Sequence, residues 1–284
     1  CAQLGPEQFA VGHSRGVEQM HAALQIDMEL NPDEVTRARD VANAHNAFSR
    51  AAVKWLLERA PGLVTMLPAV EAFMGADAAE LWYYGDLPDE APQQTYHMCW
   101  GGHQGCALTS AVFPLVLAHA MRALAGKLWA YQDDVVERAA ASLLASVTDA
   151  EVAAAFGAVG LEMAVHKDTC VLPPGTPAGL KETLTAGIDT ARGGTITDTA
   201  TGGIRRALGA PLTTSASFAT AALRDLTEAH HHLLKLLADM GVDFPHEATR
   251  LLQVVAVRKH CHLLAMVPPE TAAAALEKAD DATL

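Results

Sequence analysis

The sequence has few cysteines, no long hydrophobic run and no excess of basic residues, and each shortage excludes a class of protein. Its five cysteines are Cys1, Cys99, Cys106, Cys170 and Cys261, and no two of them have the Cys-x-x-Cys spacing of a zinc site. An odd, scattered set of this kind is typical of reduced thiols rather than of a disulfide framework. We therefore expect a reducing compartment and an intracellular protein, either nuclear or cytoplasmic.

The longest apolar stretch is too short to cross a membrane. It covers residues 111–124, is interrupted by His119 and Arg122, and falls below the roughly 20 residues that a bilayer-spanning helix needs. We expect no membrane span. The chain begins with Cys1 rather than Met, which indicates a fragment or a trimmed product whose own N-terminal address is out of view.

Basic residues are also scarce. The chain has 33 acidic and 20 basic residues and a formal net charge of −13 at pH 7, so its surface repels a polyanion on average. Nucleic-acid-binding proteins usually carry a basic field. A protein that binds nucleic acid in a cleft, however, needs positive charge only along that cleft, and residues 205–259 hold seven lysines and arginines against five acids. Charge therefore weighs against a nucleic-acid partner without excluding one.

The length bounds the number of domains. With 284 residues, half of them hydrophobic, the chain can bury one large core or two modest ones. No low-complexity segment or short-period repeat is present in the sequence. A main domain with a smaller appendage is the natural expectation.

The clearest pattern covers residues 101–136. It opens with Gln104 and Gly105, continues as an apolar segment over 107–124, and closes with the adjacent aspartates Asp133 and Asp134 between apolar residues. Residues 128–131 and 135–136 predict the arms of a hairpin with the aspartates at its turn. Adjacent carboxylates there repel each other and lose hydration, so a cation would stabilise them. Oxygen ligands favour a hard metal such as Mg²⁺. A solvated turn is the alternative.

This stretch resembles the palm of a reverse transcriptase. Residues 131–134 match that family's Tyr-x-Asp-Asp motif, and residues 102–108, followed by Phe113, match its Gly-x-x-Gln-Gly element and the helix after it. The resemblance implies an RNA-directed DNA polymerase, a nucleotidyltransferase of the kind found in retrotransposons. It also implies an upstream carboxylate and a downstream lysine.

Asp40 is the upstream carboxylate. Residues 43–50 after it are similar to the Asn-Ala-Phe-Asn-x-x-Ser-Arg of non-LTR-type retroelement polymerases, so the resemblance places Asp40 as the first metal-binding carboxylate. His45 departs from the pattern, since the family has there an aromatic residue that packs against the sugar and excludes ribonucleotides. The departure puts nucleotide selection in doubt. The alternative for Asp40 is a helix N-cap.

Lys167 is the downstream lysine, at the entry of a strand expected over residues 165–172. The resemblance implies that it approaches the pyrophosphate leaving group and protonates it. A solvated lysine is the alternative. By the same resemblance His45, Gln104, Gly105 and Tyr131 contact the substrate or template.

The resemblance assigns the catalytic and metal-binding roles together. Asp40, Asp133 and Asp134 would hold two Mg²⁺ ions about 4 Å apart, with Mn²⁺ as a substitute, and Lys167 would complete the catalytic set. The implied partners are an RNA template with a DNA primer and a deoxynucleoside triphosphate. Two alternatives stay open. One is a catalytically decayed retroelement fragment or a palm-like nucleic-acid-binding domain, favoured by His45, by the acidic surface and by the missing N-terminal part of the fingers. The other is an unrelated helical interaction protein.

The implied fold class is α+β. We expect a polymerase palm, meaning a small antiparallel sheet backed by helices, with partial fingers over residues 1–203, and a primer-grip strand with a helical thumb-like region over 204–284. The expected helices cover residues 16–30, 51–59, 63–74, 107–124, 137–146, 150–163, 218–240, 246–266 and 271–279. The expected strands cover residues 34–41, 81–84, 95–100, 128–131, 165–172 and 207–212.

Overall fold

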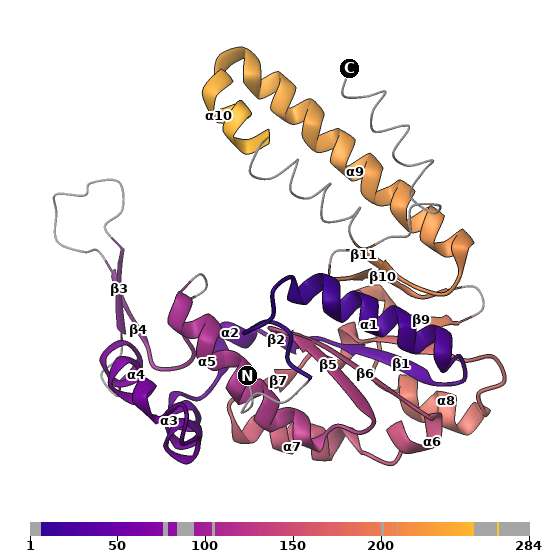
Figure 1. The fold of residues 1–284 in the computed structure, drawn as a ribbon, viewed down its shortest axis with the longest axis horizontal. Helices are drawn as coiled ribbons and strands as arrows, with labels where there is room; N and C mark the ends of the chain where they lie inside the picture. Colours follow the sequence, from indigo (N-terminus) through magenta and orange to yellow (C-terminus); the bar gives the residue numbers. More distant parts are fainter. Residues whose placement is uncertain are drawn as a thin grey trace.

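A five-stranded sheet forms the centre of the fold. The computed structural model describes residues 7–75, 79–83, 94–103, 106–199, 202–208, 210–252 and 266. The strands lie in the order β5-β6-β1-β8-β9, antiparallel except for the parallel pair β8 and β9 (Figure 1). Their bounds are β1 (Val35–Arg39), β5 (Lys127–Tyr131), β6 (Asp134–Ala139), β8 (Thr169–Leu172) and β9 (Thr195–Asp198).

Helix α1 (Gly16–Leu30) covers one face of this sheet. Its residues Met20, Leu24 and Met28 recur every four positions, so they share one side of the helix. That side packs against Val136 of β6 and Val171 of β8, and all of these side chains are at most 4% exposed. The helix expected over residues 16–30 is confirmed.

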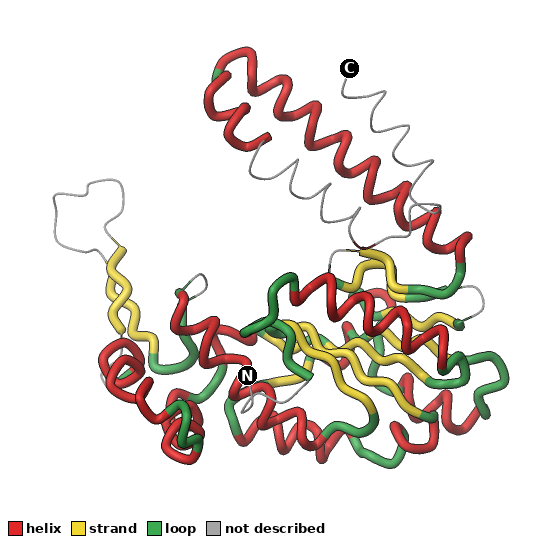
Figure 2. The backbone as a smooth tube through the Cα atoms, in the orientation of Figure 1, coloured by secondary structure: helices red, strands yellow, loops and turns green. Residues whose placement is uncertain are grey.

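Four helices cover the opposite face, which holds most of the core (Figure 2). Phe113 and Phe156, both fully buried, anchor two of them beside β5 and β6. Val35 and Cys170 anchor the other two on β1 and β8. The four are α5 (Ala107–Ala120), α6 (Ala141–Leu144), α7 (Asp149–Ala158) and α8 (Ala178–Thr185).

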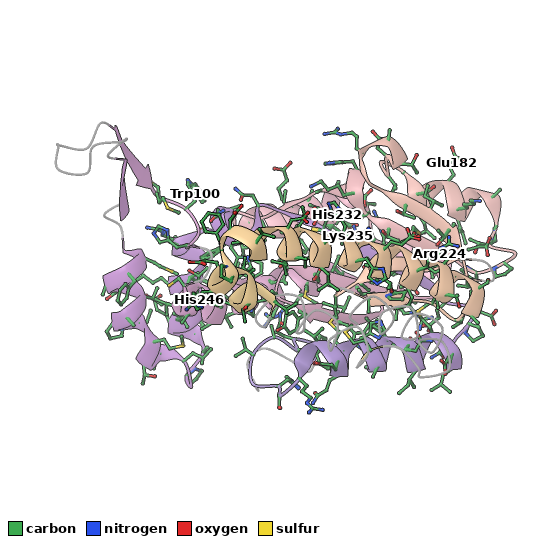
Figure 3. The ribbon with its side chains drawn as sticks, turned by 90° about the horizontal axis from the view of Figure 1, so that it is seen from above. Trp100, Glu182, Arg224, His232, Lys235 and His246 are labelled. Atoms are coloured by element: carbon green, nitrogen blue, oxygen red, sulfur yellow. The ribbon has the colours of Figure 1, made fainter. Side chains whose placement is uncertain are left out.

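Smaller elements extend this body. A hairpin of β3 and β4 projects from the end where α3 and α4 lie, and α9 begins beside β11 and runs back above the body toward that end (Figures 1 and 3). The bounds are β2 (Val41–Ala42), α2 (Ala44–Ala47), α3 (Arg50–Arg59), η1 (Val64–Met66), α4 (Leu67–Met74), β3 (Ala79–Tyr83), β4 (Gln94–Met98), η2 (Met121–Ala123), β7 (Glu162–Met163), η3 (Val165–Lys167), η4 (Thr190–Arg192), β10 (Ile204–Ala207), β11 (Ala210–Leu212), α9 (Ala216–Asp243) and α10 (Pro245–Leu251).

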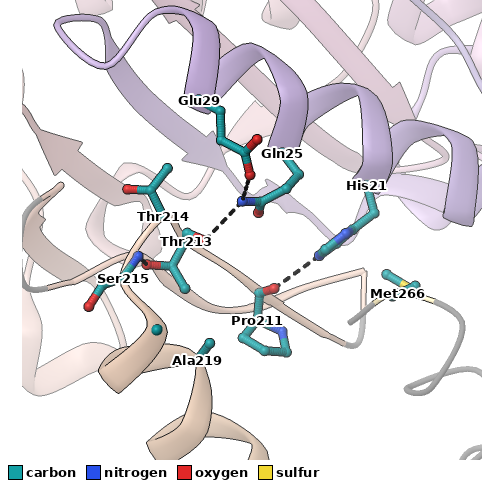
Figure 4. Close-up of a pocket in the computed structure, with 10 residues that line it drawn as sticks. His21, Gln25, Glu29, Pro211, Thr213, Thr214, Ser215, Ala219 and Met266 are labelled. Atoms are coloured by element: carbon teal, nitrogen blue, oxygen red, sulfur yellow. Dashed lines mark hydrogen bonds between the residues drawn. The ribbon is translucent and has the colours of Figure 1, made fainter. Parts of the chain in front are cut away.

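Polar contacts attach β11 to α1. His21, which is 3% exposed, donates from Nε2 to the Pro211 carbonyl at 3.0 Å, and Gln25 Nε2 donates to the Thr213 carbonyl at 3.0 Å. Gln25 Nε2 also lies 2.9 Å from Glu29 Oε1. These side chains line a cavity of about 340 Å³ that reaches the start of α9 (Figure 4). The hairpin of β10 and β11 is therefore held to α1 by hydrogen bonds.

The expected α+β fold, with a small sheet backed by helices, is confirmed. Four local expectations are wrong. The helix expected over residues 150–163 ends at Ala158, and Glu162 and Met163 form β7, which pairs with β2. Residues 137–146 are not one helix, because β6 continues through Ala139. Residues 165–172 form η3 before β8 begins at Thr169. Residues 207–212 belong to two strands joined at Leu208, whose φ is 53°.

The helices expected beyond residue 252 fall outside the described residues. In the part of the chain that the structure describes, no helix has the length and apolar character required to span a bilayer.

Candidate active site

A tight turn presents the two adjacent aspartates. Tyr131 of β5 pairs with Asp134 of β6, which leaves Gln132 and Asp133 as a two-residue turn. Gln132 has φ 52°, the sign that a type II′ hairpin turn requires at its first central position. Asp133 therefore lies exposed at the tip, while Asp134 begins β6 at the edge of the packed sheet.

Asp40 lies directly across from this turn. It follows the last residue of β1, and Arg39 of β1 pairs with Val135 of β6 in an antiparallel ladder. The next position along that ladder brings Asp40 opposite Asp134. The Asp40 carbonyl accepts a hydrogen bond from Ala164 N at 2.9 Å, which fixes the backbone at the end of the strand.

The three carboxylates interact electrostatically. Burial, followed by the negative charges of Asp133 and Asp40, raises the pKa of Asp134 from 3.8 to about 6. Asp134 is exposed to solvent, whereas the next five residues of β6 are buried. A raised carboxyl pKa means that the ionised form is disfavoured, and a nearby cation would reverse that effect.

A small recess adjoins these residues. It has a volume of about 130 Å³, and Asp40 and Asp134 are among the residues that line it. Its apolar lining includes Met20 of α1 and Ile204 and Leu208 from the β10–β11 hairpin. Both aspartates therefore face the side of the sheet on which α1 lies.

The structure brings Lys167 to the same corner. Lys167 is the last residue of η3, and its Nζ lies 3.5 Å from Asp40 Oδ2, with both side chains about half exposed (53% and 48%). The two residues are more than a hundred positions apart in the chain. An exposed pair of this kind contributes little to stability, so Lys167 is free to take another anionic partner.

The donor set suits a divalent cation. Carboxylate oxygens are the ligands that Mg²⁺ prefers. Burial, and after it the charges of Asp133 and Asp40, raise the pKa of Asp134, and a bound cation would oppose both effects. Among the described residues, no three His, Cys, Asp or Glu side chains converge closely enough to hold a metal ion. The carboxylates of Asp40, Asp133 and Asp134 nevertheless have the chemistry and charge that Mg²⁺ requires. Because these side chains do not converge, they would have to rotate to share an ion.

Two of the expected substrate-contacting residues lie beside the turn. The His45 ring stacks on Phe113, with centroids 4.6 Å apart, and its Nε2 lies 3.3 Å from Gln132 Oε1. Tyr131 is half-buried and packs against the apolar cluster beneath α1. His45 is therefore held in place by a contact on each side.

Gln104 and Gly105 lie outside the described residues. The glycines before them dock on the segment that follows Asp40. Gly101 N donates to the Phe48 carbonyl at 2.7 Å, and Gly102 N donates to the His45 carbonyl at 2.8 Å. These bonds hold Gly101 and Gly102 next to the segment that contains His45.

A buried ionic network under Asp40 escaped the sequence reasoning. Arg37 donates from Nε to Asp168 Oδ2 at 3.1 Å, and Arg39 donates from Nε to Glu137 Oε1 at 2.6 Å. Asp168 Oδ1 in turn accepts from Asp40 N at 3.4 Å. Burial raises the pKa of Asp168 to about 6 against the opposing charges of Arg37 and Arg39. Arginines at alternate positions of one strand were the available signal, because they share a face.

Comparisons with known proteins add little to this geometry. No family model matches the chain. None of the curated proteins matches it either. Among solved structures, a Sicinivirus 3Dpol RNA-dependent RNA polymerase aligns with 52% of this chain at 15% identity, with a TM-score of 0.33. The aligned region spans 31% of that polymerase. Likeness of this strength indicates neither activity nor substrate.

Proposed function

We propose that this chain is an RNA-directed DNA polymerase domain of a retrotransposon-like element, which transfers nucleotides to the 3′ hydroxyl of a primer. The observation that supports it most is the meeting of Asp40, Asp134 and Lys167 at one corner of the sheet. These residues come from three separate parts of the sequence. Together with Asp133 they are the residues that the family resemblance marks as catalytic.

The three aspartates would hold two Mg²⁺ ions, or Mn²⁺ in their place. Bound there, the ions would supply the Lewis-acid activation of the primer hydroxyl and of the departing pyrophosphate. The chain's own contribution is position and charge. Asp40 and Asp134 face each other across β1 and β6, so the sheet sets their separation before any ligand arrives.

Lys167 would act on the leaving group. Its ammonium lies next to Asp40, where a triphosphate bound by the aspartates would arrive. With Asp40 engaged as a metal ligand, Lys167 would be free to turn to the phosphates. It would then stabilise the negative charge that develops on pyrophosphate and donate a proton to it.

The neighbouring residues would position the nucleotide and the primer. His45, fixed between Phe113 and Gln132, would contact the sugar, while Tyr131, Gln104 and Gly105 would contact the nucleotide or the template. The β10–β11 hairpin lines the recess beside Asp40 and Asp134, where a primer end would lie. This supports a palm with partial fingers over residues 1–203 and a primer-grip and thumb-like region over 204–284.

Primer extension tests the proposal. The purified chain is given a primed RNA template, deoxynucleotides and Mg²⁺ or Mn²⁺. Asp40→Asn, Asp133→Asn and Asp134→Asn should each reduce extension by at least about 10²-fold, because each removes charge that stabilises the transition state. Glu182→Gln on α8, an exposed carboxylate outside the cluster, is the matched control. Full extension by Asp134→Asn would overturn the assignment.

The same assay addresses a second candidate, a palm-like domain that binds nucleic acid without catalysis. His45 favours it, because an imidazole stands where the resembled family has an aromatic residue against the sugar, and the structure holds that imidazole beside the turn. A wild-type chain that binds the primed template yet adds no nucleotide with either metal would establish this candidate instead.

A further inference from the structure

A second cavity lies between α3, α4 and the end of β4. Its volume is about 510 Å³, within the range of pockets that bind small ligands. One side of it is apolar, formed by Val70 and Met74, which are 3% and 5% exposed. Arg50 and Lys54, one helical turn apart on α3, line the cavity as well. The cavity thus combines an apolar wall with two cations.

Arg50 is held rigidly and is incompletely paired. Its Nε donates to the Gly101 carbonyl at 2.9 Å, which fixes the plane of the guanidinium. Its Nη1 is shielded from water and has no hydrogen-bond partner among the described residues. A buried donor without an acceptor is unfavourable. An anionic oxygen entering the cavity would satisfy it after a rotation of the side chains that cover Nη1.

Lys54 supplies a second, mobile cation. Its Nζ lies 2.8 Å from Glu71 Oε1, and both side chains are about half exposed (52% and 54%). Glu71 also lines the cavity, so Arg50, Lys54 and Glu71 together leave one excess positive charge. On a chain with a net charge of −13, a local positive excess around an apolar cavity is selective for an anion that also carries an apolar part.

An exposed aromatic residue stands at the edge of this site. Trp100 follows Cys99, which lines the cavity, and is 58% exposed. It lies where the β3–β4 hairpin rejoins the body (Figure 3). Exposed aromatic rings next to basic side chains are typical of surfaces that bind unpaired bases.

We propose that this cavity binds one unpaired nucleotide of a single-stranded nucleic acid. The base lies against Val70 and Met74, and a phosphate oxygen takes the bonds offered by Arg50 and Lys54. This inference rests on the proposed function, since a template strand ahead of the primer supplies such a nucleotide.

The position of the cavity agrees with this role. Arg50 bonds to Gly101, the neighbouring Gly102 bonds to His45, and His45 contacts Gln132 in the aspartate turn. A short series of contacts therefore joins the cavity to the acidic cluster. A strand lying along this loop would pass from the cavity to Asp133.

The Cys99 thiol gives a direct test that does not depend on catalysis. Cys99 is free and exposed and lines the cavity, whereas Cys170 is buried and serves as an unreactive reference. The rate of Cys99 alkylation by iodoacetamide is followed by peptide mass with and without a short oligouridine. Saturating oligouridine should slow it at least about fivefold, because base stacking and phosphate contacts hold the strand over the thiol.

Three variants locate the effect. Arg50→Gln and Lys54→Gln should each weaken the protection, whereas Lys181→Gln, an exposed lysine of α8, should leave it intact. Ala51→Trp fills the cavity from an exposed position without touching the Arg50 bond to Gly101, so it should abolish protection even if Arg50→Gln unfolds. Loss of protection in Lys181→Gln to the same degree would overturn the proposal.

The remaining outcomes separate this site from the polymerase assignment. Equal protection by inorganic tripolyphosphate would show a site for charge alone and overturn the nucleotide proposal. A wild type that extends primers while its template leaves Cys99 unprotected would overturn it too, with the polymerase assignment intact. Protection that persists in Asp134→Asn supports the cavity site, whichever way the extension assay turns out.

Discussion

Arg37 and Arg39 extend from the same side of β1 into a region closed to water. Their side chains are 5% and 4% exposed, and the carboxylates nearest to them are Asp168 at 0% and Glu137 at 2%. Asp149, which is 43% exposed, approaches both arginines at 3.6 and 3.8 Å. Taking such charges out of water is costly, so the loss of one partner leaves a buried charge without compensation.

Asp168→Asn should therefore destabilise the fold strongly. We expect the free energy of unfolding to fall by about 3 kcal/mol or more, since two buried guanidinium groups lose their shared counter-charge. Asp149→Asn faces the same arginines from a partly exposed position and should cost less than about 1 kcal/mol. Urea unfolding followed by circular dichroism measures both. Equal losses would mean that burial does not decide the strength of these pairs.

Removing the Asp134 carboxylate should stabilise the fold in the absence of metal, whereas removing that of Asp168 destabilises it. Its folded pKa of about 6 lies above its ordinary 3.8, so the ionised form costs the folded state stability above about pH 6 and the cost disappears as the pH falls toward 4. Asp134→Asn should therefore raise the melting temperature in EDTA near neutral pH, by an amount that shrinks on acidification.

Metal addition gives the matching control for Asp134. Mg²⁺ at about ten times its dissociation constant should stabilise the wild type by about 1.4 kcal/mol, because it binds only the folded site. Asp134→Asn should show little of this gain. Thermal melts with and without Mg²⁺ measure both effects, and an identical Mg²⁺ response in the two proteins would contradict a metal site at Asp134.

Among single residues, the sequence predicted those that stand at motif positions. It missed those whose importance depends on a partner far away in the chain. Asp40, Asp134 and Lys167 stand at motif positions and do meet in space. Arg37 and Asp168 carry no motif, and a charged residue in a strand is usually taken as exposed. The alternation of Arg37 and Arg39 in one strand indicates a shared face, but it does not indicate that Asp168, 131 positions further along the chain than Arg37, is the partner.

The loop before Gln104 depends on its first glycine. Gly101 has φ 56°, and a Cβ there would lie 2.3 Å from the backbone of Asn46. Gly101→Ala should thus lower the free energy of unfolding by more than about 1 kcal/mol. Gly157 in α7 has open space around it, so Gly157→Ala should stabilise by about 0.5–1 kcal/mol. Thermal denaturation of both variants checks the contrast, and a neutral Gly101→Ala would show that the loop can move away from Asn46.

Elements with an apolar repeat were predictable, and those without one were not. Helix α1 has its repeat at Met20, Leu24 and Met28. Residues 135–136 were predicted as a hairpin arm, but the rest of β6 was predicted as the start of a helix over residues 137–146. Arg138 in this part is 1% exposed and donates to Thr36 Oγ1 at 2.8 Å, a pairing with β1 that no local pattern indicates. Strand β9 escaped because an edge strand needs only backbone bonds to β8 and carries no apolar alternation of its own.

At the scale of the molecule, net charge was a poor guide to the site. The excess of acids argued against a polyanionic partner, and that average holds. The average does not say where the charges lie. Negative charge is concentrated at the corner with Asp40, Asp133 and Asp134, whereas the cavity at Arg50 has an excess of positive charge. Placement of charge follows from the fold and cannot be summed from composition.

The β10–β11 hairpin shares a core with the body. Ile204, Ala207 and Leu212 pack in the same cluster as Met20 and Leu24 of α1, and Leu212 is fully buried. Leu212→Ala should cost about 2–5 kcal/mol through the cavity it leaves. Leu236→Ala on α9 removes the same atoms from a position that is 52% exposed and should change stability by less than about 0.5 kcal/mol.

The shape of the unfolding curve then tests the boundary predicted between residues 203 and 204. Trp129 packs against the cluster that contains Leu212, so its fluorescence reports that core once the other three tryptophans, Trp55, Trp82 and Trp100, are replaced by Phe. Circular dichroism at 222 nm reports all helices, α9 included. If the hairpin folds with the body, Leu212→Ala shifts both signals to lower urea together, because the cluster is one cooperative unit. A signal that splits in two, with the fluorescence change unmoved by Leu212→Ala, would instead mean that the hairpin and α9 fold as a unit separate from the sheet.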